Sequence, residues 1–285
     1  MEIRKLRNED QARLEDFVLP RINSSIFLLA NSRQAGLIDR GERLEGTYFA
    51  AIDSDRIVGV IAHYWLGNLV LQAPESLPEL MAAVQAADVR PILGLLGPGD
   101  QVAAAKAILD FDEERVQLDE QEGLYALDLS ELVIPDDLCS GRLSGRRIQP
   151  RDLDRVTEWR IAYHLALLGA EDTPELRAGC RDDMAGSCER GDTWVLEDGG
   201  EVVASTSFNA VLDEVVQVGG VWTPPESRGR GYGRAVVAVS LIDARDEGVG
   251  RSVLFTGDEN LGARKAYAAL GYQRIGDYRI TLFRE

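Results

Sequence analysis

The sequence predicts two tandem α/β units, and two observations carry that prediction. A strand, tight turn and second strand at Phe49–Val60 recur 145 positions later at Trp194–Ser205. A short apolar strand that runs into a turn and a helix occurs at Arg90–Phe111 and again at Arg251–Tyr272, 161 positions apart. We interpret the matched order as an internal repeat. The alternative is that two unrelated α/β domains share an element order by chance.

The remaining elements follow the same order in both halves. The opening strand around Ile3 has its counterpart at Ile148, and acidic helix starts follow at Asn8–Asp10 and Pro150–Asp152. Each unit is expected to run strand, helices, antiparallel strands, helix, strand, helix and strand. The last strand of the chain is expected at Gly276–Phe283. The two offsets differ by 16, so the second copy carries about 16 extra residues between these landmarks.

Pro, Gly and Ser punctuate the stretch Pro135–Gly141, which predicts the linker. We therefore expect domains at residues 1–137 and 142–285. The charge distribution also indicates two units with different roles. Residues 1–140 hold 25 acidic against 12 basic residues, whereas the remainder holds 23 against 19.

Composition excludes several classes of protein. The 285 residues are 45% hydrophobic and 28% charged, as in ordinary globular proteins, and the net charge of −17 argues against duplex nucleic acid or anionic lipid as a partner. Three cysteines without a CxxC pair predict no disulfide framework, and the chain shows no secretory signal and no apolar run of bilayer length. We therefore expect a soluble cytoplasmic protein that does not bind a membrane. Two distant histidines and no Cys/His cluster predict no metal site.

The most informative stretch is Val215–Arg234, which begins as an apolar strand, breaks at two prolines and enters a glycine-rich loop before the helix Ala235–Ala244. Unpaired backbone N–H groups at a helix N-terminus favour an anion, and glycine lets the backbone approach a phosphate. The spacing is not that of a P-loop, nor of the dinucleotide fingerprint, because Arg234 stands where the last glycine is needed. It fits R-x-x-G-x-G at Arg228–Gly233.

That motif resembles the acyl-CoA pyrophosphate loop of the GNAT superfamily of N-acetyltransferases. A second motif follows at Asn260–Tyr272 and resembles the N-x-x-A-x-x-x-Y-x-x-x-G-[FY] segment of the superfamily. It matches at Asn260, Ala263, Tyr267, Gly271 and Tyr272. The whole chain also resembles two-domain GNAT proteins whose first domain is a degenerate copy. The resemblance implies two GNAT-like domains, each with a mixed, mostly antiparallel central sheet flanked by helices.

The resemblance further implies acetyl-CoA as co-substrate. Its pantetheine arm would pair with the end of the fourth strand of the second domain, and backbone amides of the loop would bind the pyrophosphate. The residues implied are Val221, Trp222, Thr223, Arg228, Gly229, Arg230, Gly231, Tyr232, Gly233, Arg234 and Asn260. Tyr267 matches the general acid that protonates the departing thiolate.

Several of these residues also have purely structural interpretations. Tyr267 lies at helical spacing between Ala263 and Leu270, so it also fits a core position. Asn260 either contacts the pantetheine or serves as an ordinary helix N-cap. His164, in the helix Leu153–Leu168, either lines the acceptor cleft or packs, and packing is favoured.

The general base departs from the family pattern. Gln217 and Phe255 occupy positions that often carry acids, and neither accepts a proton near pH 7. Two alternatives remain for removal of the amine proton: a water relay to Asp213 or Glu214, or an amine that arrives neutral. For the two acids we favour the interpretation that they are solvated surface residues. In the first copy Lys106 stands at the Tyr267 position and no R-x-x-G-x-G occurs, so we expect a structural first domain.

These observations lead to one function hypothesis and two alternatives. The leading hypothesis is an N-acetyltransferase that moves an acetyl group from acetyl-CoA to a primary amine, of a small molecule or a protein N-terminus, by direct attack in a ternary complex. One alternative is transfer of a longer acyl group, or transfer to a hydroxyl acceptor. The other is a non-catalytic acyl-CoA sensor or scaffold.

Overall fold

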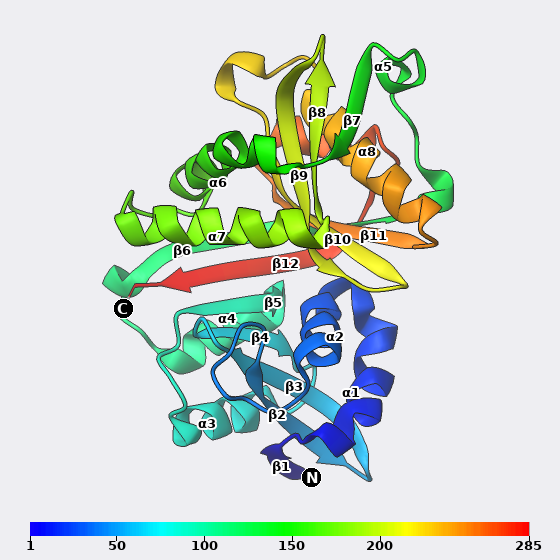
Figure 1. Cartoon of the computed structure of the whole chain (residues 1–285). Coiled ribbons are helices and arrows are strands. Elements are labelled where there is room, and N and C mark those ends of the chain that lie inside the picture. The colour runs from blue at the N-terminus through cyan, green and yellow to red at the C-terminus, as the bar shows by residue number, and fades with distance from the viewer. Residues whose placement is uncertain (285) are drawn as a thin grey trace. The chain divides into compact units, whose positions relative to one another are not determined.

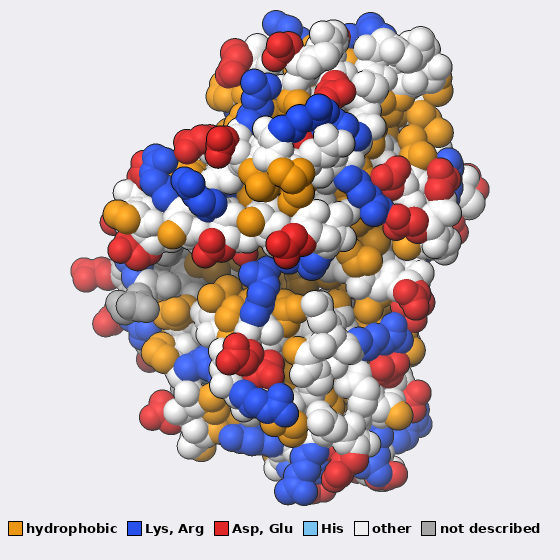
Figure 2. Space-filling model, viewed as in Figure 1, with side chains coloured by type: hydrophobic (Ala, Val, Ile, Leu, Met, Phe, Trp, Pro, Cys, Tyr) orange, Lys and Arg blue, Asp and Glu red, His pale blue; other side chains and the backbone are white. Residues whose placement is uncertain are grey.

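The computed structural model describes residues 1–284 and divides the chain into two compact units (Figure 1). The first contains Met1–Leu124 together with the stretch from Gly276 onward, and the second is Tyr125–Ile275. No helix in the described part of the chain is long and apolar enough to cross a bilayer. On the face drawn in Figure 2, acidic and basic side chains lie intermixed.

The elements that begin within the first 124 residues are five strands, four helices and one long strand that continues into the second unit. They are β1 (Glu2–Lys5), α1 (Gln11–Val18), α2 (Ile22–Ala35), β2 (Gly46–Asp53), β3 (Arg56–Tyr64), β4 (Asn68–Gln72), α3 (Leu77–Ala87), β5 (Gly94–Pro98), α4 (Gly99–Leu109) and β6 (Val116–Asp128). The pairs β1–β2, β2–β3 and β3–β4 are antiparallel, whereas β4 and β5 are parallel.

The elements that begin after residue 124 follow the same order, after one additional short helix. They are α5 (Asp136–Cys139), β7 (Leu143–Arg147), α6 (Leu153–Leu167), α7 (Pro174–Arg190), β8 (Thr193–Asp198), β9 (Glu201–Val211), β10 (Val215–Trp222), α8 (Tyr232–Asp246), β11 (Arg251–Gly257), α9 (Leu261–Ala268) and β12 (Gln273–Phe283). The pairs β7–β8, β8–β9 and β9–β10 are antiparallel, and β10–β11 is parallel. The expected mixed, mostly antiparallel sheets flanked by helices are confirmed.

The last strand differs from the expectation. The C-terminal part of β12 pairs antiparallel with β5, from Tyr278↔Pro98 to Leu282↔Gly94, and therefore belongs to the first unit. Conversely, the end of β6 lies in the second unit beside β11, where the Leu129 N–H donates to the Gly250 carbonyl at 2.9 Å. The observed units thus differ from the expected 1–137 and 142–285. The end of β6, which follows α4 of the first unit, belongs to the second unit, and most of β12, which follows α9 of the second unit, belongs to the first.

A cluster around Asp119 holds the C-terminal strand in the first unit. The Arg279 guanidinium donates to both Asp119 oxygens at 2.7 and 2.8 Å, and Lys106 Nζ and Thr281 Oγ1 donate at 2.9 and 2.8 Å. These donors, Arg279 first, hold the pKa of the Asp119 carboxyl well below its usual range, against the opposing effect of burial. Phe283 adds an apolar anchor, since it is buried in the core that α3 and α4 cover.

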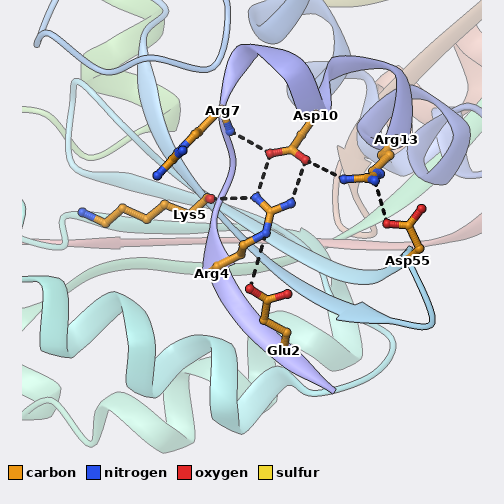
Figure 3. A network of polar contacts seen from close by, with 7 residues as sticks. All are labelled: Glu2, Arg4, Lys5, Arg7, Asp10, Arg13 and Asp55. Atoms are coloured by element: carbon orange, nitrogen blue, oxygen red, sulfur yellow. Dashed lines mark hydrogen bonds and ion pairs between the residues drawn. The ribbon is translucent and has the colours of Figure 1, made fainter.

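The repeat is visible at the start of each unit. Arg4 forms a two-pronged pair with Asp10, at 2.7 Å for both bonds, and Asp10 also accepts from the Arg7 backbone (Figure 3). In the second unit Arg146 pairs with Asp152 in the same way, at 2.6 and 3.0 Å. This correspondence runs at an offset of 142.

The register of the opening strands therefore corrects the sequence-based alignment. Leu6 N–H donates to the Tyr48 carbonyl as Ile148 N–H donates to the Thr193 carbonyl, so the counterpart of Ile148 is Leu6 and not Ile3. The expected strand–turn–strand repeat is confirmed, because the turns Ser54–Asp55 and Gly199–Gly200 both have positive φ at their two central residues.

The second unit has helices on both faces of its sheet. Along β8, Trp194 and Leu196 pack in the core that contains α8, whereas Val195 packs with Val156 of α6 and Met184 of α7. Alternating residues of a strand point to opposite faces, so α8 covers one face and α6 and α7 cover the other. The strand β10 lies between these two helical layers and positions the candidate site.

Candidate active site

The two parallel strands β10 and β11 pair over a short distance only. Their register runs from Val215↔Arg251 to Gln217↔Val253, the last pair within the described residues, although β10 continues to Trp222. On its other edge β10 pairs with β9 through two irregularities, between Gln217 and Val218 and between Gly219 and Trp222. Bulges bend a strand and end its pairing. The end of β10 therefore presents unpaired backbone groups toward β11.

A loop of nine residues connects β10 to α8. It contains a short 3₁₀ turn at Pro225–Ser227 and ends at Gly231, the residue before the first turn of α8. No side chain among the described residues caps this helix, and its first intrahelical bond runs from Ala235 N–H to the Gly231 carbonyl at 3.0 Å. The N–H groups of Tyr232, Gly233 and Arg234 precede that bond, so they and the helix dipole are available to an anion.

Two glycines of the loop are required by backbone conformation. Gly229 and Gly231 have φ of 77° and 80°, a left-handed conformation that costs an ordinary residue about 1–2 kcal/mol. Gly233 has no such φ, and a Cβ there would lie 3.5 Å from Thr223 Oγ1, an ordinary contact. Gly229 and Gly231 are also exposed, so the backbone that they form is open to a ligand.

The predicted arginines of the loop have different environments. Arg228 is exposed, donates to the Thr223 carbonyl at 3.0 Å and lies 5.3 Å from the centre of the Trp222 ring. Arg230 is also exposed. Arg234 is half-buried, and its Nε is buried without a hydrogen-bond partner among residues 1–284. A buried guanidinium atom without a partner at an uncapped helix N-terminus fits a binding site for a phosphate group.

Two predicted binding residues have structural roles for their side chains. The Tyr232 ring is buried and its hydroxyl donates to Asp198, so only its backbone faces the loop. Asn260 caps α9, because its side-chain oxygen accepts from Ala263 N–H at 3.1 Å. The remaining predicted residues of the strand end, Val221, Trp222 and Thr223, lie where β10 passes into the loop.

Tyr267 lies on α9 and is 7% exposed, within the core cluster of the second unit. Its ring meets Tyr272 edge to face at 5.9 Å. The Tyr272 hydroxyl shares a hydrogen bond of 2.6 Å with Ser252 Oγ, and burial raises the pKa of Tyr272 well above its usual value. The helix thus places Tyr267 on the core side, as the structural interpretation expected, next to the strand β11 that borders the site.

The acids that we considered for a proton relay lie at the wrong end of β10. Asp213 and Glu214 are exposed and precede Val215, the first residue of the strand. The strand end at Gly220 is six residues beyond Glu214, roughly 20 Å at the rise of an extended chain. A single water cannot bridge that distance, so the relay from the strand end to Asp213 or Glu214 is not favoured by the structure.

Gln217 occupies the strand position itself. It is 2% exposed, its amide nitrogen donates to the Val218 carbonyl at 2.8 Å, and its Oε1 is buried with no partner in the described part of the chain. A neutral amide accepts a hydrogen bond but not a proton. Phe255 is half-buried on β11.

One group that the sequence analysis missed lies on the opposite face of β10. Arg160 of α6 approaches Gly220, and its Nε is buried with no hydrogen-bond partner among the residues that the structure describes. Arg160 follows no motif, and its helix position alone looks like a surface position. His164, one turn further, has a buried Nε2 that also lacks a partner. Burial, and then the charge of Arg160, lower the pKa of His164 to about 4, so the imidazole is neutral at pH 7.

The corresponding region of the first unit is closed. Only four residues connect β4 to α3, and the N–H of the first of them, Ala73, donates to Gln101 Oε1 of α4 at 2.6 Å. A Cβ on Gly97 of β5 would lie 2.7 Å from the Leu71 carbonyl oxygen, so the two strands stay in contact there. Lys106, at the position that matches Tyr267, pairs with Asp119.

Comparisons with known proteins find similar sequences over part of the chain. Residues 153–272 match the family described as acetyltransferase (GNAT) family. N-acetyltransferase family 8 member 2 of Rattus norvegicus is 31% identical over 97 residues, which cover 32% of this chain and 43% of that protein. The chain spans about half the length of the curated relatives it matches, for example 43% and 59% of the first two.

Several solved structures match over nearly the whole chain, and because their sequence identity is low the match shows similarity of fold alone. An acetyltransferase from the GNAT family of Colwellia psychrerythraea covers 100% of both chains with 15% identity and a TM-score of 0.55. A tandem GNAT protein from the clavulanic acid biosynthesis pathway covers 100% of this chain and 98% of its own, with 14% identity and a TM-score of 0.52. The second unit therefore carries the match to the acetyltransferase (GNAT) family, and the fold of the whole chain is similar to that of solved GNAT proteins.

Proposed function

We propose that the protein is an N-acetyltransferase that moves the acetyl group of acetyl-CoA to a primary amine. The observation that carries the proposal is the uncapped N-terminus of α8 beside the unpaired end of β10. The helix end supplies N–H donors and a favourable dipole for the pyrophosphate, and Arg234 adds a guanidinium with an unpartnered Nε. Each charge-assisted bond contributes about 1.5–3 kcal/mol net, so a few such bonds are enough for micromolar binding.

The strand end would hold the reacting part of the co-substrate. The unpaired backbone near Val221 can pair with the pantetheine arm and polarise the thioester carbonyl. The amine nitrogen then attacks the carbonyl carbon, a C–N bond forms, and the C–S bond breaks. Tyr267 gives its proton to the departing CoA thiolate, the amine releases its proton to solvent, and Tyr267 then takes a proton back from solvent. The residue at the usual position of the base is Gln217, so the acceptor is expected to arrive as the neutral amine.

The first unit is proposed as a structural partner without an acetyl-CoA site. Its short β4–α3 connection and the Ala73–Gln101 bond occupy the place of the loop and strand opening found in the second unit. Experiment distinguishes the proposed function from two alternatives. One is a transferase for a longer acyl group or a hydroxyl acceptor, and the other is a non-catalytic acyl-CoA sensor.

Calorimetric titration of acetyl-CoA into the full chain tests the binding step. We expect one site per chain, and Gly231→Ala is expected to weaken binding at least tenfold, because a left-handed alanine at the helix start costs about 1–2 kcal/mol and displaces the loop. Gly248→Ala is the matched control: its φ of 97° imposes the same strain at the other end of α8.

Release of CoA thiol with a panel of amines, alcohols and longer acyl-CoA donors then tests the transfer step. One site and turnover with amines support the proposal. Binding without turnover on any acceptor supports the sensor, and two sites per chain contradict the proposed role of the first unit. Absence of binding refutes the proposed function altogether.

A further inference from the structure

A hollow of about 710 Å³ opens on the first unit, beside the place where β1 ends and β2 begins. Binding sites for small molecules have volumes of this order. The lining residues come from the end of β1 and the residues after it, from the loop after α2 and from β2, and they include Lys5, Arg7, Glu9, Leu37, Ile38 and Thr47. All of them belong to Met1–Leu124, so the first unit forms the hollow by itself.

Two cationic side chains at the end of β1 lie on the same face of the sheet. Lys5 pairs with Phe49 of β2, and its ammonium lies over the Phe49 ring, 5.5 Å from the ring centre. Arg7 is two residues further along an extended backbone, with φ of −129° and ψ of 169°, so its side chain leaves the chain on the same face. Figure 3 shows both side chains directed to one side, away from Asp10. Both cations line the hollow.

Neither cation has an ion pair among residues 1–284, whereas the neighbouring charges do. Arg4 is paired with Asp10 at 2.7 Å, and Arg90 is paired with Asp39 at 2.5 Å. The remaining acid that lines the hollow is Glu9, which is exposed and has no ion pair in the described part of the chain. Both cations are exposed as well, so a ligand can reach them. The unpaired groups at the hollow thus carry two positive charges and one negative charge.

The second unit contains the same ring-and-cation arrangement with its charge neutralised. At the offset of 142, Lys5 corresponds to Arg147, whose guanidinium also lies over an aromatic ring, that of Trp194, at 5.3 Å. Arg147 is paired with Asp243 and Glu247 of α8. The repeat therefore shows how a cation at this position is satisfied within the protein, and the first unit lacks that solution.

Other positions around the hollow also differ between the two copies. The register of the opening strands gives the counterparts of Arg7, Thr47 and Glu9 as Gln149, Asp192 and Arg151. Two of these exchanges make the hollow of the first unit more positive, and the third places one carboxylate at its edge. Two like charges on one face, roughly 7 Å apart along an extended chain, repel each other. An anion bound between them removes that repulsion.

We propose that this hollow binds a small molecule that carries one phosphate monoester group, held between Lys5 and Arg7. A guanidinium offers two parallel N–H donors to phosphate oxygens, and an ammonium adds a compact positive charge. Two cations match the two negative charges of a phosphate monoester, and the carboxylate of Glu9 disfavours a second phosphate beside the first. Leu37 and Ile38 give the hollow an apolar wall for the organic part of the ligand.

The hollow does not correspond to the acetyl-CoA site proposed for the second unit. Thr47 pairs with His63 of β3, which in turn pairs with Leu69 near the start of β4. The proposed acetyl-CoA loop follows the opposite end of the equivalent strand in the second unit, β10. The phosphate site is therefore independent of the proposed function and assigns no acetyl-CoA to the first unit.

Calorimetric titration of the full chain at low ionic strength tests the site. The probes are inorganic phosphate, glycerol 3-phosphate, phenyl phosphate and phenyl sulfate, which has the shape of phenyl phosphate with a single charge. We expect at least one of the two monoesters to bind about tenfold or more tightly than inorganic phosphate, and phenyl phosphate to bind more tightly than phenyl sulfate.

Variants at the two cations assign the binding to the hollow. Lys5→Gln and Arg7→Gln are each expected to weaken the binding of the monoester about tenfold or more, because each removes a charge-assisted contact. Both side chains are exposed, so the variants stay folded. Arg56→Gln is the matched control: it removes one exposed arginine at the start of β3, which does not line the hollow, and is expected to bind like the wild-type chain.

The outcomes separate this proposal from the proposed function. No binding of either monoester, equal affinity for phenyl phosphate and phenyl sulfate, or equal losses in Arg56→Gln and Arg7→Gln would each overturn it. Binding that is lost in Gly231→Ala and kept in Arg7→Gln would place the phosphate at the loop before α8 and overturn it as well. Lys5→Gln and Arg7→Gln are expected to bind acetyl-CoA like the wild-type chain, and loss of that binding would assign the two cations to the co-substrate instead.

Discussion

Replacing Tyr267 by phenylalanine removes a single hydroxyl from the core side of α9. The ring stays, and with it the edge-to-face contact with Tyr272 at 5.9 Å and the burial of a side chain that is 7% exposed. The loss in stability is therefore limited to about 0.5–1.5 kcal/mol, the net value of one hydrogen bond. A variant with so small a structural change stays folded and isolates the proton-donor role.

The expected effect on turnover is much larger. Proton transfer by a positioned acid contributes about 10²–10⁴-fold to rate, so kcat for release of the CoA thiol is expected to fall by at least 100-fold. The affinity for acetyl-CoA is expected to stay within about twofold of wild type, because the proposed pyrophosphate contacts lie at Gly229–Arg234 and not on α9. Steady-state release of CoA thiol measures the first quantity, and calorimetry measures the second.

Tyr272→Phe is the matched control. It removes the hydroxyl that shares a 2.6 Å hydrogen bond with Ser252, so its cost in stability is similar. That hydroxyl lies in the core, and the proposed mechanism assigns it no proton transfer. If Tyr267 only packs in the core, the two variants lose activity to the same small extent. A kcat for Tyr267→Phe equal to that of Tyr272→Phe would therefore refute the assignment of Tyr267 as the acid.

Two further predictions concern the fold. A chain that ends at Ile275 loses the pairing of β12 with β5, two of the donors to Asp119, and the buried side chains of Tyr278 and Phe283, whose burial contributes about 1.5–3 kcal/mol each. We expect the amides of residues 1–124 to lose protection from hydrogen exchange, while those of residues 125–275 keep theirs. Protection of both segments would contradict the observed units. The pKa of His164 is about 4 in the folded chain and about 6.5 in the unfolded chain, so the unfolded chain binds the proton first and stability falls as the pH drops from about 6.5 towards 4. His164→Gln is expected to show a smaller fall in Tm over this range. Parallel curves of Tm against pH for the variant and the wild type would contradict this prediction.

The sequence alone was sufficient for the features that depend on neighbours along the chain. The apolar strand before Trp222 and the glycines with left-handed backbone at Gly229 and Gly231 follow from residue types at fixed short spacings, whereas the sequence left open whether Asn260 caps a helix or contacts the pantetheine. Residue types also account for the two turns at Ser54–Asp55 and Gly199–Gly200, which revealed the repeat. The proposed roles of the loop residues and of Tyr267 stay predictions.

Other features depend on partners that are distant in sequence. No periodicity indicates that the end of β12 pairs with β5, about 180 positions away, because a strand pattern shows which face is buried but not which edge it joins. The offset at the opening strands was misjudged for a related reason: Ile3 and Ile148 are similar residues, whereas the Arg4–Asp10 and Arg146–Asp152 pairs that define the register are recognisable only in three dimensions.

The surroundings of β10 show both the features that the local sequence determines and those that tertiary packing determines. Its local motif predicted an anion cradle, since a helix N-terminus and glycines act through the backbone of consecutive residues. Which side chains face the strand was decided by tertiary packing. It moved Asp213 and Glu214 out of reach, turned the Tyr232 ring into the core, and brought Arg160 against Gly220. Burial and charge pairing depend on the whole surroundings of a group, and only the folded chain supplies those surroundings.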